Sequence, residues 1–183
     1  AQSSSAVDSA RAVRSPYHRA GFTLGDVAAW TAAHPGVARV FTAADIPGRN
    51  AFGVIPAFAD QPVLAVDETR FRGEAVALIV GEAETVAALN LADFPVSWKE
   101  RPALLTIEAA LAAGAPLLHA GRPGNTLTRG WVCRGNVEDA LAAAAAIAEG
   151  EFETGFVEHA YIEPEAGFAV RNGRLTMTRT EAE

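Results

Sequence analysis

The chain of 183 residues contains only one cysteine, one methionine and one lysine, Lys99. One cysteine excludes a disulfide framework and a zinc cage built on several thiolates. Every apolar run is shorter than the about 20 residues that a membrane-spanning helix needs, because Asp, Glu, Arg, Gly or Pro interrupts it. No membrane segment is therefore expected. The N-terminal residues 1–5 carry no basic segment followed by an apolar core, and we therefore expect no secretory signal.

The chain is acidic, with a formal net charge of −7 at pH 7. Nucleic-acid binding needs a basic field to meet the phosphates, so this balance argues against a DNA or RNA partner. Half of the residues are hydrophobic and 20% are charged, a composition that excludes an intrinsically disordered chain. These features predict a soluble, cytoplasmic α/β protein.

Caps and turn residues divide the first 115 residues into alternating strands and helices, which is typical of one compact α/β domain. Thr23 stands three residues before Asp26 and predicts a capping box for a helix over 24–34. The most strand-like segment is 71–80, whose apolar run at 75–80 predicts burial on both faces. The other elements expected here are strands over 37–41 and 94–98, a helix over 82–91, and a short helix capped by Thr106 that ends before Gly114.

The composition changes after residue 115. Glycine, proline and asparagine interrupt 116–136, which is predicted to be an extended connector. A helix is expected over 137–148, followed by strands over 149–169 and 174–180. One helix and two or three strands do not make a stable domain. The predicted organisation is therefore a first domain over 1–115, the connector, and the truncated start of a second domain over 137–183.

The common catalytic signatures are absent, since the sequence has no phosphate-binding loop, dinucleotide-binding glycine turn, nucleophile elbow or Cys-x-x-Cys pair. Histidine stands among several carboxylates only at His159, beside Glu158, Glu163 and Glu165. On a helix, His159 and Glu163 would share a face suited to a metal ion. The preceding residues alternate as a strand does, and in a strand these two side chains lie about 13 Å apart. We therefore predict no metal ligand.

One cysteine remains as a candidate nucleophile. Cys133 lies between Trp131 and Arg134, and a neighbouring arginine can make a thiol more reactive. No base is assigned to this thiol, so the favoured interpretation is a small apolar filler. We therefore predict no catalytic residue in this chain.

A group of basic residues lies near the beginning of the chain. Arg11, Arg14 and Arg19, together with His18, suggest an anion site, because guanidinium groups suit carboxylates and phosphates. A chain almost without lysine also uses arginine as its ordinary surface cation. Solvated surface positions are therefore the favoured interpretation.

Eight sequence blocks stand in a characteristic order: 13–17 (VRSPY), 35–48 (PGVARVFTAADIPG), 60–65 (DQPVLA), 70–80 (RFRGEAVALIV), 108–111 (EAAL), 114–119 (GAPLLH), 134–140 (RGNVEDA) and 157–166 (VEHAYIEPEA). Together they resemble the molybdenum hydroxylase family, the large subunits of xanthine dehydrogenases, aldehyde oxidoreductases and carbon monoxide dehydrogenases. No single block is diagnostic. The match rests on their order and spacing across nearly the whole chain.

The resemblance implies an α/β hammerhead domain over 1–115, followed by the first strands of a molybdopterin-binding domain. It also implies a hydroxylase that inserts water-derived oxygen into an aldehyde or an N-heterocycle, with molybdopterin (the molybdenum cofactor) as its cofactor. Iron–sulfur and FAD groups are expected on partner subunits or domains. In the family, the glycine-rich loop beside the molybdenum and the glutamate base lie far downstream. This chain alone is therefore expected to be inactive.

One family position can be compared directly. Xanthine dehydrogenase-like members have a Gly-Gly-Gln-x-His-x-x-x-Glu motif near the metal, and 155–163 of this chain is similar, with Val157 at the glutamine position. A valine side chain cannot donate a hydrogen bond, which argues against a xanthine- or carbon monoxide-type site. Phe156, Val157 and Glu158 are the candidate residues near the molybdenum.

The sequence leaves two other functions open. The first is a non-catalytic assembly or docking module, and the second is one half of a naturally split large subunit. The expected partners are the remainder of the molybdopterin-binding subunit and the iron–sulfur and flavin subunits. Open strand edges also favour a homo-oligomer. Neither nucleic acid nor a membrane is an expected partner.

The apolar residues of 148–180 predict how this chain behaves alone. Burial of one such side chain stabilises by about 1.5–3 kcal/mol, so leaving half of them in water forfeits roughly 10 kcal/mol. We expect this tail to fold back on the first domain, to pair between chains, or to stay partly disordered. Size-exclusion chromatography and hydrogen exchange check this. A monomer whose 150–180 segment is well protected without intramolecular partners would contradict it.

Overall fold

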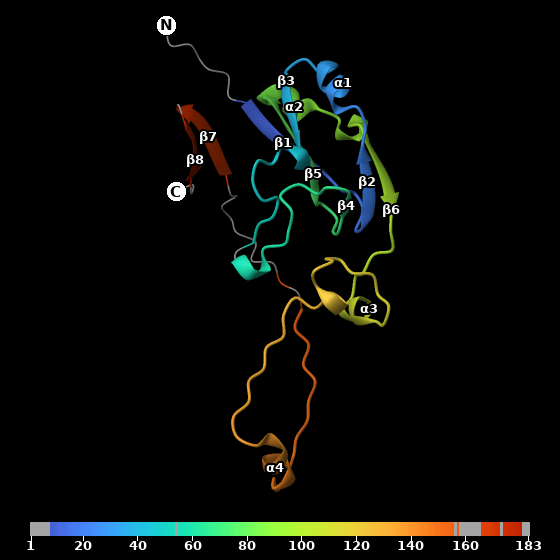
Figure 1. The fold of residues 1–183 in the computed structure, drawn as a ribbon, viewed down its shortest axis with the longest axis vertical. Coiled ribbons are helices and arrows are strands. Elements are labelled where there is room, and N and C mark those ends of the chain that lie inside the picture. Colours follow the sequence, from blue (N-terminus) through green and yellow to red (C-terminus); the bar gives the residue numbers. More distant parts are fainter. Residues whose placement is uncertain (1–7, 54, 156, 158–165, 173, 181–183) are drawn as a thin grey trace. The chain divides into compact units, whose positions relative to one another are not determined.

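The computed structural model describes residues 8–53, 55–155, 157, 166–172 and 174–180. The chain divides into two compact units, Ala1–Gly130 and Trp131–Glu183. Helices and strands are mixed, which confirms the predicted fold class (Figure 1). No helix among the described residues has the length and apolar character to cross a membrane.

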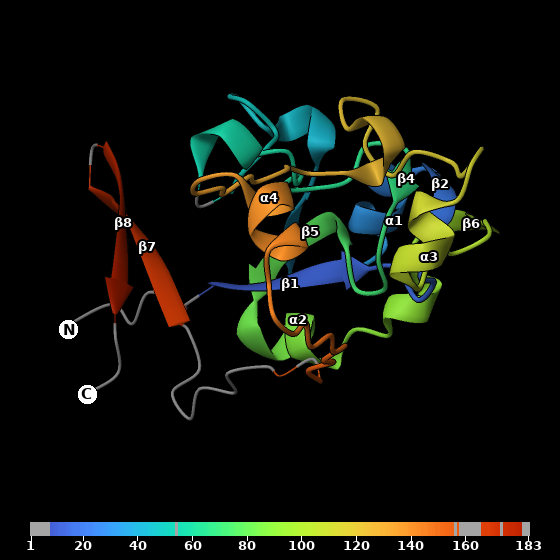
Figure 2. The ribbon, with the colours of Figure 1, turned by 90° about the horizontal axis from the view of Figure 1, so that it is seen from below.

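The first unit is built on a three-stranded antiparallel sheet with β5 at its centre (Figures 1 and 2). The strands, in sheet order, are β1 (Asp8–Arg14), β5 (Ala75–Glu82) and β3 (Val37–Thr42). Val76 and Ala77 point to opposite faces and are both fully buried, which confirms the burial predicted for the 75–80 run. The predicted start at 71 was wrong, because 71–74 form a turn in which Gly73 has φ +96°.

A second antiparallel sheet has the order β4-β2-β6. It contains β4 (Glu68–Thr69), β2 (Ala20–Leu24) and β6 (Val96–Glu100). No pattern in the sequence predicted β2, and the helix expected over 24–34 wrongly included its last residue, Leu24. Ala20 and Phe22 of β2 are nevertheless buried, so tertiary packing determines this short strand.

The helices are shorter than predicted. In α1 (Val27–Ala32) the cap is Asp26, whose carboxylate accepts from the N–H of Ala29 at 2.8 Å, and Thr23 lies in β2 instead. The prediction for Thr106 is confirmed, since its hydroxyl accepts from the N–H of Ala109 at the start of α3. The remaining helices of the first unit are α2 (Ala83–Ala88), α3 (Ile107–Leu111), and the 3-10 turns η1 (Ala43–Asp45), η2 (Pro56–Phe58), η3 (Leu91–Asp93) and η4 (Pro123–Asn125).

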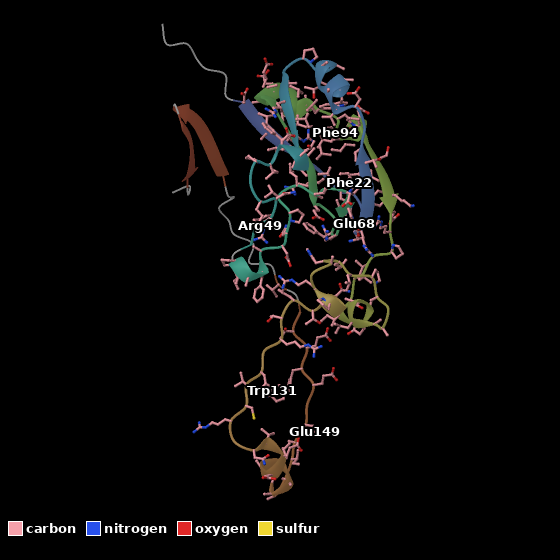
Figure 3. The ribbon with its side chains drawn as sticks, in the orientation of Figure 1. Phe22, Arg49, Glu68, Phe94, Trp131 and Glu149 are labelled. Atoms are coloured by element: carbon pink, nitrogen blue, oxygen red, sulfur yellow. The ribbon has the colours of Figure 1, made fainter. Side chains whose placement is uncertain are left out.

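Aromatic rings fill the core of the first unit. Phe22 lies 5.5 Å from Trp98 between ring centroids, and Phe94 meets Trp30 edge-on at 5.2 Å (Figure 3). Phe22, Trp30 and Phe94 are each less than 10% exposed. Together with the aliphatic residues of β5 they form one continuous apolar cluster. This core joins β2 and α1 to the β1-β5-β3 sheet.

The second unit contains α4 (Val137–Ala142) and a hairpin of β7 (Ala166–Asn172) and β8 (Arg174–Thr180). The predicted helix over 137–148 is cut short after Ala142, and no strand forms over 149–155, so the predicted strand over 149–169 was wrong there. The predicted strand over 174–180 is confirmed as β8, which pairs antiparallel with β7 and places Phe168 opposite Thr178. Residues 158–165 lie outside the described part of the chain.

Close approach of β3 to β5 depends on Gly81. A Cβ atom at this position would collide with the carbonyl oxygen of Gly36 and lie 2.9 Å from the Cα atom of Val37. We expect Gly81→Ala to lower the free energy of unfolding by about 1–3 kcal/mol, because backbone cannot move aside cheaply. Urea denaturation measures the change. Gly48→Ala is the matched control, since nothing lies within 4 Å of its Cβ position; an equal loss in both variants would contradict the prediction.

Candidate functional site

The candidate residues near a molybdenum site fall in the second unit. Val157 is described and is 79% exposed, outside any helix or strand. Phe156 and Glu158 lie outside the described residues, as do His159, Glu163 and Glu165. Their predicted role therefore stays a prediction.

The structure gives Cys133 no activating neighbour among the described residues. The thiol is exposed and its only hydrogen bond there runs to the carbonyl oxygen of Gly135, at 3.5 Å. Trp131 beside it is 89% exposed (Figure 3). Because Cys133 is exposed, the interpretation as a small apolar filler of the interior does not describe it.

The three N-terminal arginines do not converge on one anion site. The Arg11 guanidinium donates to the carbonyls of Val86, Ala87 and Leu89 at 3.3, 3.2 and 2.9 Å, at the end of α2. Such a cation satisfies the last carbonyls of a helix and favours its dipole. Arg14 donates to the carbonyl of Gly73 at 2.7 Å. Both residues hold the fold together.

Arg19 belongs to a charged cluster that the sequence analysis missed. Its Nε donates to Oε1 of Glu68 at 2.7 Å, and Arg101 donates to Oε2 of the same carboxylate at 2.5 Å. The Arg19 and Glu68 side chains are 9% and 19% exposed. The cluster ties β2, β4 and the end of β6 together. No local pattern signals it, because Glu68 is 49 and 33 positions from its partners.

A second buried polar group lies where β1 ends. The hydroxyl of Thr69 donates toward Ser15 Oγ at 3.0 Å, and the N–H of Ser15 donates to the carbonyl of Glu74 at 2.9 Å. Ser15, Thr69 and Glu74 are each at most 3% exposed. The Glu74 carboxylate accepts from the N–H of Arg70 through Oε2, and Oε1 has no hydrogen-bond partner among the described residues. This orphaned oxygen is an unusual feature of the unit.

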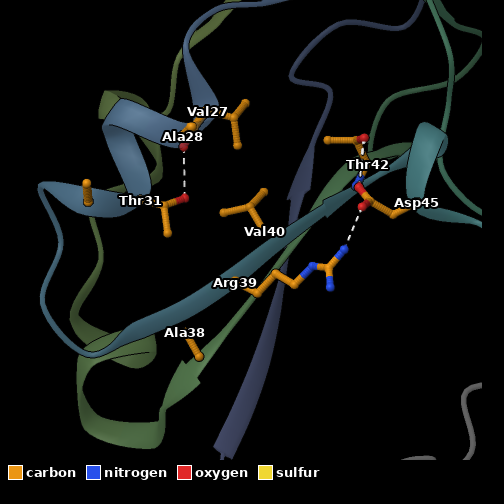
Figure 4. A pocket seen from close by; sticks show the side chains of 9 residues that line it. Val27, Ala28, Thr31, Ala38, Arg39, Val40, Thr42 and Asp45 are labelled. Carbon is orange, nitrogen blue, oxygen red and sulfur yellow. Dashed lines mark hydrogen bonds and ion pairs between the residues drawn. The ribbon is translucent and has the colours of Figure 1, made fainter.

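A groove of about 530 Å³ lies beside α1, β3 and η1 (Figure 4). Its polar side chains are occupied within the protein. The hydroxyl of Thr31 donates to the carbonyl of Val27 at 2.8 Å, and Arg39 pairs with Asp45 at 2.9 Å. The residues that line the groove therefore offer an apolar surface with an ion pair at one end, without a free nucleophile or base.

Asp45 is the titrating group of this groove. The backbone N–H of Thr42, followed by the Arg39 guanidinium, holds the pKa of Asp45 below its usual value. The same carboxylate closes the capping box at the start of η1. Its charge therefore stabilises both β3 and the turn that follows.

No group of three or more potential ligands that could hold a metal ion occurs among the described residues. The polar side chains of the groove are engaged with one another or with backbone, and Val157 carries only methyl groups. No catalytic step is assigned to the described residues.

The depressed pKa of Asp45 predicts the sign of a pH effect. The folded carboxyl titrates below its unfolded value of about 3.9, so its contribution is present above that pH and is lost as pH falls through the folded pKa. We expect Asp45→Asn to lower Tm at pH 7 and to converge with the parent chain toward pH 2. Thermal unfolding across this range measures it, with Glu100→Gln at the exposed end of β6 as control. A Tm difference that stays constant down to pH 2 would contradict the assignment.

Two family models match consecutive parts of the chain. Residues 4–102 match the model for the aldehyde oxidase and xanthine dehydrogenase a/b hammerhead domain. Residues 118–181 match the molybdopterin cofactor-binding domain. A probable xanthine dehydrogenase subunit from Bacillus subtilis is 37% identical over 144 residues, which are 78% of this chain and 19% of that protein. The putative xanthine dehydrogenase molybdenum-binding subunit XdhA of Escherichia coli is 30% identical over 169 residues, covering 84% and 21%.

Two solved structures have a fold similar to that of this chain. Quinoline 2-oxidoreductase from Pseudomonas putida superposes with a TM-score of 0.78 at 29% identity, over 96% of this chain and 23% of that one. Aldehyde oxidoreductase from Desulfovibrio gigas gives the same TM-score at 24% identity, over 97% and 20%, which shows a shared fold. The chain thus spans about a fifth of the length of these relatives. Since the hammerhead model alone covers more than half of its residues, the chain belongs to the aldehyde oxidase and xanthine dehydrogenase family.

Proposed function

We propose that these residues are the N-terminal portion of the molybdenum-binding subunit of a hydroxylase. The observation that supports this is the order of the two matches, hammerhead over 4–102 and molybdopterin cofactor-binding domain over 118–181. In this proposal 1–115 is the hammerhead domain, 116–136 the connector and 137–183 the start of the cofactor-binding domain. The relatives are about five times longer, so most of the proposed enzyme lies outside this chain.

The proposed reaction is hydroxylation of an aldehyde or an N-heterocycle with oxygen from water. The relatives support this class by their names, which include xanthine dehydrogenase, nicotinate dehydrogenase, quinoline 2-oxidoreductase and aldehyde oxidoreductase. Val157, in place of the glutamine typical of xanthine-type members, favours a substrate other than xanthine. Several relatives are named as molybdenum-binding or molybdopterin subunits, which supports the same cofactor for this protein.

In this proposal the remainder of the subunit supplies the catalytic groups. The described residues of this chain offer neither a metal-ligand group nor a free base in the groove. We infer that the chain alone binds no molybdenum and turns over no substrate. Iron–sulfur and flavin subunits or domains would take the electrons, as expected for a protein whose relatives are named as subunits. A cytoplasmic location also stays a prediction.

Metal content and turnover test the proposal together. The 183-residue chain and the product of the complete reading frame are purified from the same host, which must synthesise molybdenum cofactor. We expect molybdenum and oxidation of aldehydes or N-heterocycles, with an artificial electron acceptor, only in the complete protein. The short chain should match the buffer blank in both assays, because it holds no described ligand set.

Three outcomes would contradict this. Turnover by the short chain alone would show that its residues are sufficient. A complete reading frame that ends near residue 183, with neither molybdenum nor a partner that restores activity, would favour the docking module. Activity that appears only on adding a separately encoded chain would instead favour the split subunit.

A further inference from the structure

Helix α3 carries its largest apolar side chains on a face that is open to solvent. Ile107 and Leu111 stand four positions apart and share one face of the helix, and they are 73% and 57% exposed. The helix packs mainly against η4, at the end of the first unit (Figure 1). The apolar face of a surface helix normally turns toward a core. In α3 that face is left without a core to cover it.

Asn125 brings further apolar residues to this helix. Its Nδ2 donates to the carbonyl of Ala110 at 2.9 Å and to that of Pro116 at 3.1 Å. Each of these carbonyls precedes a leucine, so one side chain draws the backbones of Leu111 and Leu117 together. We call the large apolar side chains of 105–127 that are more than 40% exposed the α3 surface: Leu105, Ile107, Leu111, Leu117 and Leu127.

Hydrogen bonds hold this region in place on the first unit. The guanidinium of Arg70 donates to the carbonyl of Leu118 at 2.6 Å, and the N–H of Leu118 donates to the Asn125 side chain at 2.9 Å. Arg122 donates to the carboxylate of Asp60 at 2.8 Å. A surface that is already ordered loses little entropy when it binds, which favours docking.

The two ways of dividing the chain disagree in this region. By its contacts, the chain up to Gly130 belongs to the first unit. The match to the cofactor-binding domain, however, begins at residue 118. Residues 118–130 thus pack as part of the first unit, although in sequence they belong to the next domain. A segment shared in this way is expected where two domains meet, and the α3 surface includes part of it.

A longer subunit suits this surface better than a second copy of the chain. Quinoline 2-oxidoreductase superposes over 96% of this chain but only 23% of its own, so most of 105–127 keeps its fold within a much longer chain. Each copy of this chain carries a formal net charge of −7, and like net charges repel. The only charged residue in 105–117 is Glu108, so the matching surface should be apolar.

We propose that the α3 surface is the docking face for the part of the cofactor-binding subunit that lies outside these 183 residues. An apolar surface of that remainder buries Ile107, Leu111 and Leu117. Large exposed apolar clusters commonly mark such contacts. The hammerhead domain is then joined to the cofactor-binding region through side chains as well as through the connector. This inference rests on the proposed function, because it needs the longer subunit.

Hydrogen exchange followed by mass spectrometry tests the docking face. It compares the 183-residue chain with the product of the complete reading frame, in peptides from 105–127. The reporters are the N–H groups of Ala110 and Leu118, which donate to the Thr106 carbonyl and to the Asn125 side chain. We expect these peptides to exchange about tenfold more slowly in the complete protein, because docking stabilises their hydrogen bonds. Equal exchange in the two proteins would overturn the proposal.

The short chain distinguishes the other occupants. Exchange of 105–127 that slows as its concentration rises, together with a dimer in size-exclusion chromatography, would assign the α3 surface to a second copy. Slow exchange in a monomer at every concentration would assign it to the second unit of the same chain. Either result would overturn docking of the remainder of the subunit.

Ile107→Ser tests whether the exposed side chain itself makes the contact. Isoleucine and serine have similar helix propensities, so α3 should form equally well in both. We expect exchange of 105–127 to be unchanged in the short chain and about tenfold faster than in the parent in the complete protein. Val66→Ser is the matched control, because Val66 is 69% exposed and lies outside 105–127. It should leave exchange of 105–127 unchanged in both proteins.

An equal effect of Ile107→Ser in both proteins would show that Ile107 supports its own segment, and it would overturn the docking face. The readout needs neither molybdenum nor turnover. A complete protein that contains molybdenum and oxidises substrate, but exchanges 105–127 at the rate of the short chain, would overturn the docking face and leave the proposed function standing. A complete protein that protects 105–127 but holds no molybdenum would overturn the proposed function alone.

Discussion

Pairing of β5 with two distant strands is the constraint on which the rest of the first unit depends. β5 pairs with β1 more than 60 positions earlier and with β3 on its other side, and Ile79 at its centre is fully buried. These pairings position the side chains that project from the sheet. Arg11 on β1 thereby meets the end of α2, and Arg39 on β3 meets Asp45 at the groove. Loss of this strand would therefore remove both contacts together.

The two sheets are joined by apolar packing, since Phe22 of β2 lies in one buried cluster with Val76 and Ile79 of β5. Aromatic rings contribute much of this cluster. Trp30 packs edge-on against Phe94 and stacks on His34 at 4.0 Å between ring centroids. Large rings bury much area at little entropic cost, which suits a small unit with short helices. The polar clusters around Glu68 and Glu74 lie outside this apolar cluster. Apolar packing thus sets the fold, and charged pairs position its loops.

Local signals in the sequence predicted local structure, and distant pairings were not visible. The Thr106 cap, the strand over 37–41 and the burial of 75–80 depend on neighbouring residues, and all three are present in the structure. The continuous apolar run predicted burial on both faces but not the partners of β5, which are two antiparallel strands. The contact from Arg70 to Leu118 spans 48 positions and has no periodic signature. The candidate site near Val157 came from family resemblance alone, because its chemistry is not encoded in spacing.

The two units differ in how completely they bury their apolar residues. The first unit encloses Phe22, Trp30, Phe94 and the centre of β5, so its core is formed by its own residues. In the second unit Trp131, Val132 and Phe152 are each at least 89% exposed. Burial of a side chain of this size is worth about 1.5–3 kcal/mol, a substantial part of a domain's stability. The first unit thus has a core of its own. The second unit needs further surface to bury its apolar residues, as expected for the start of a larger domain.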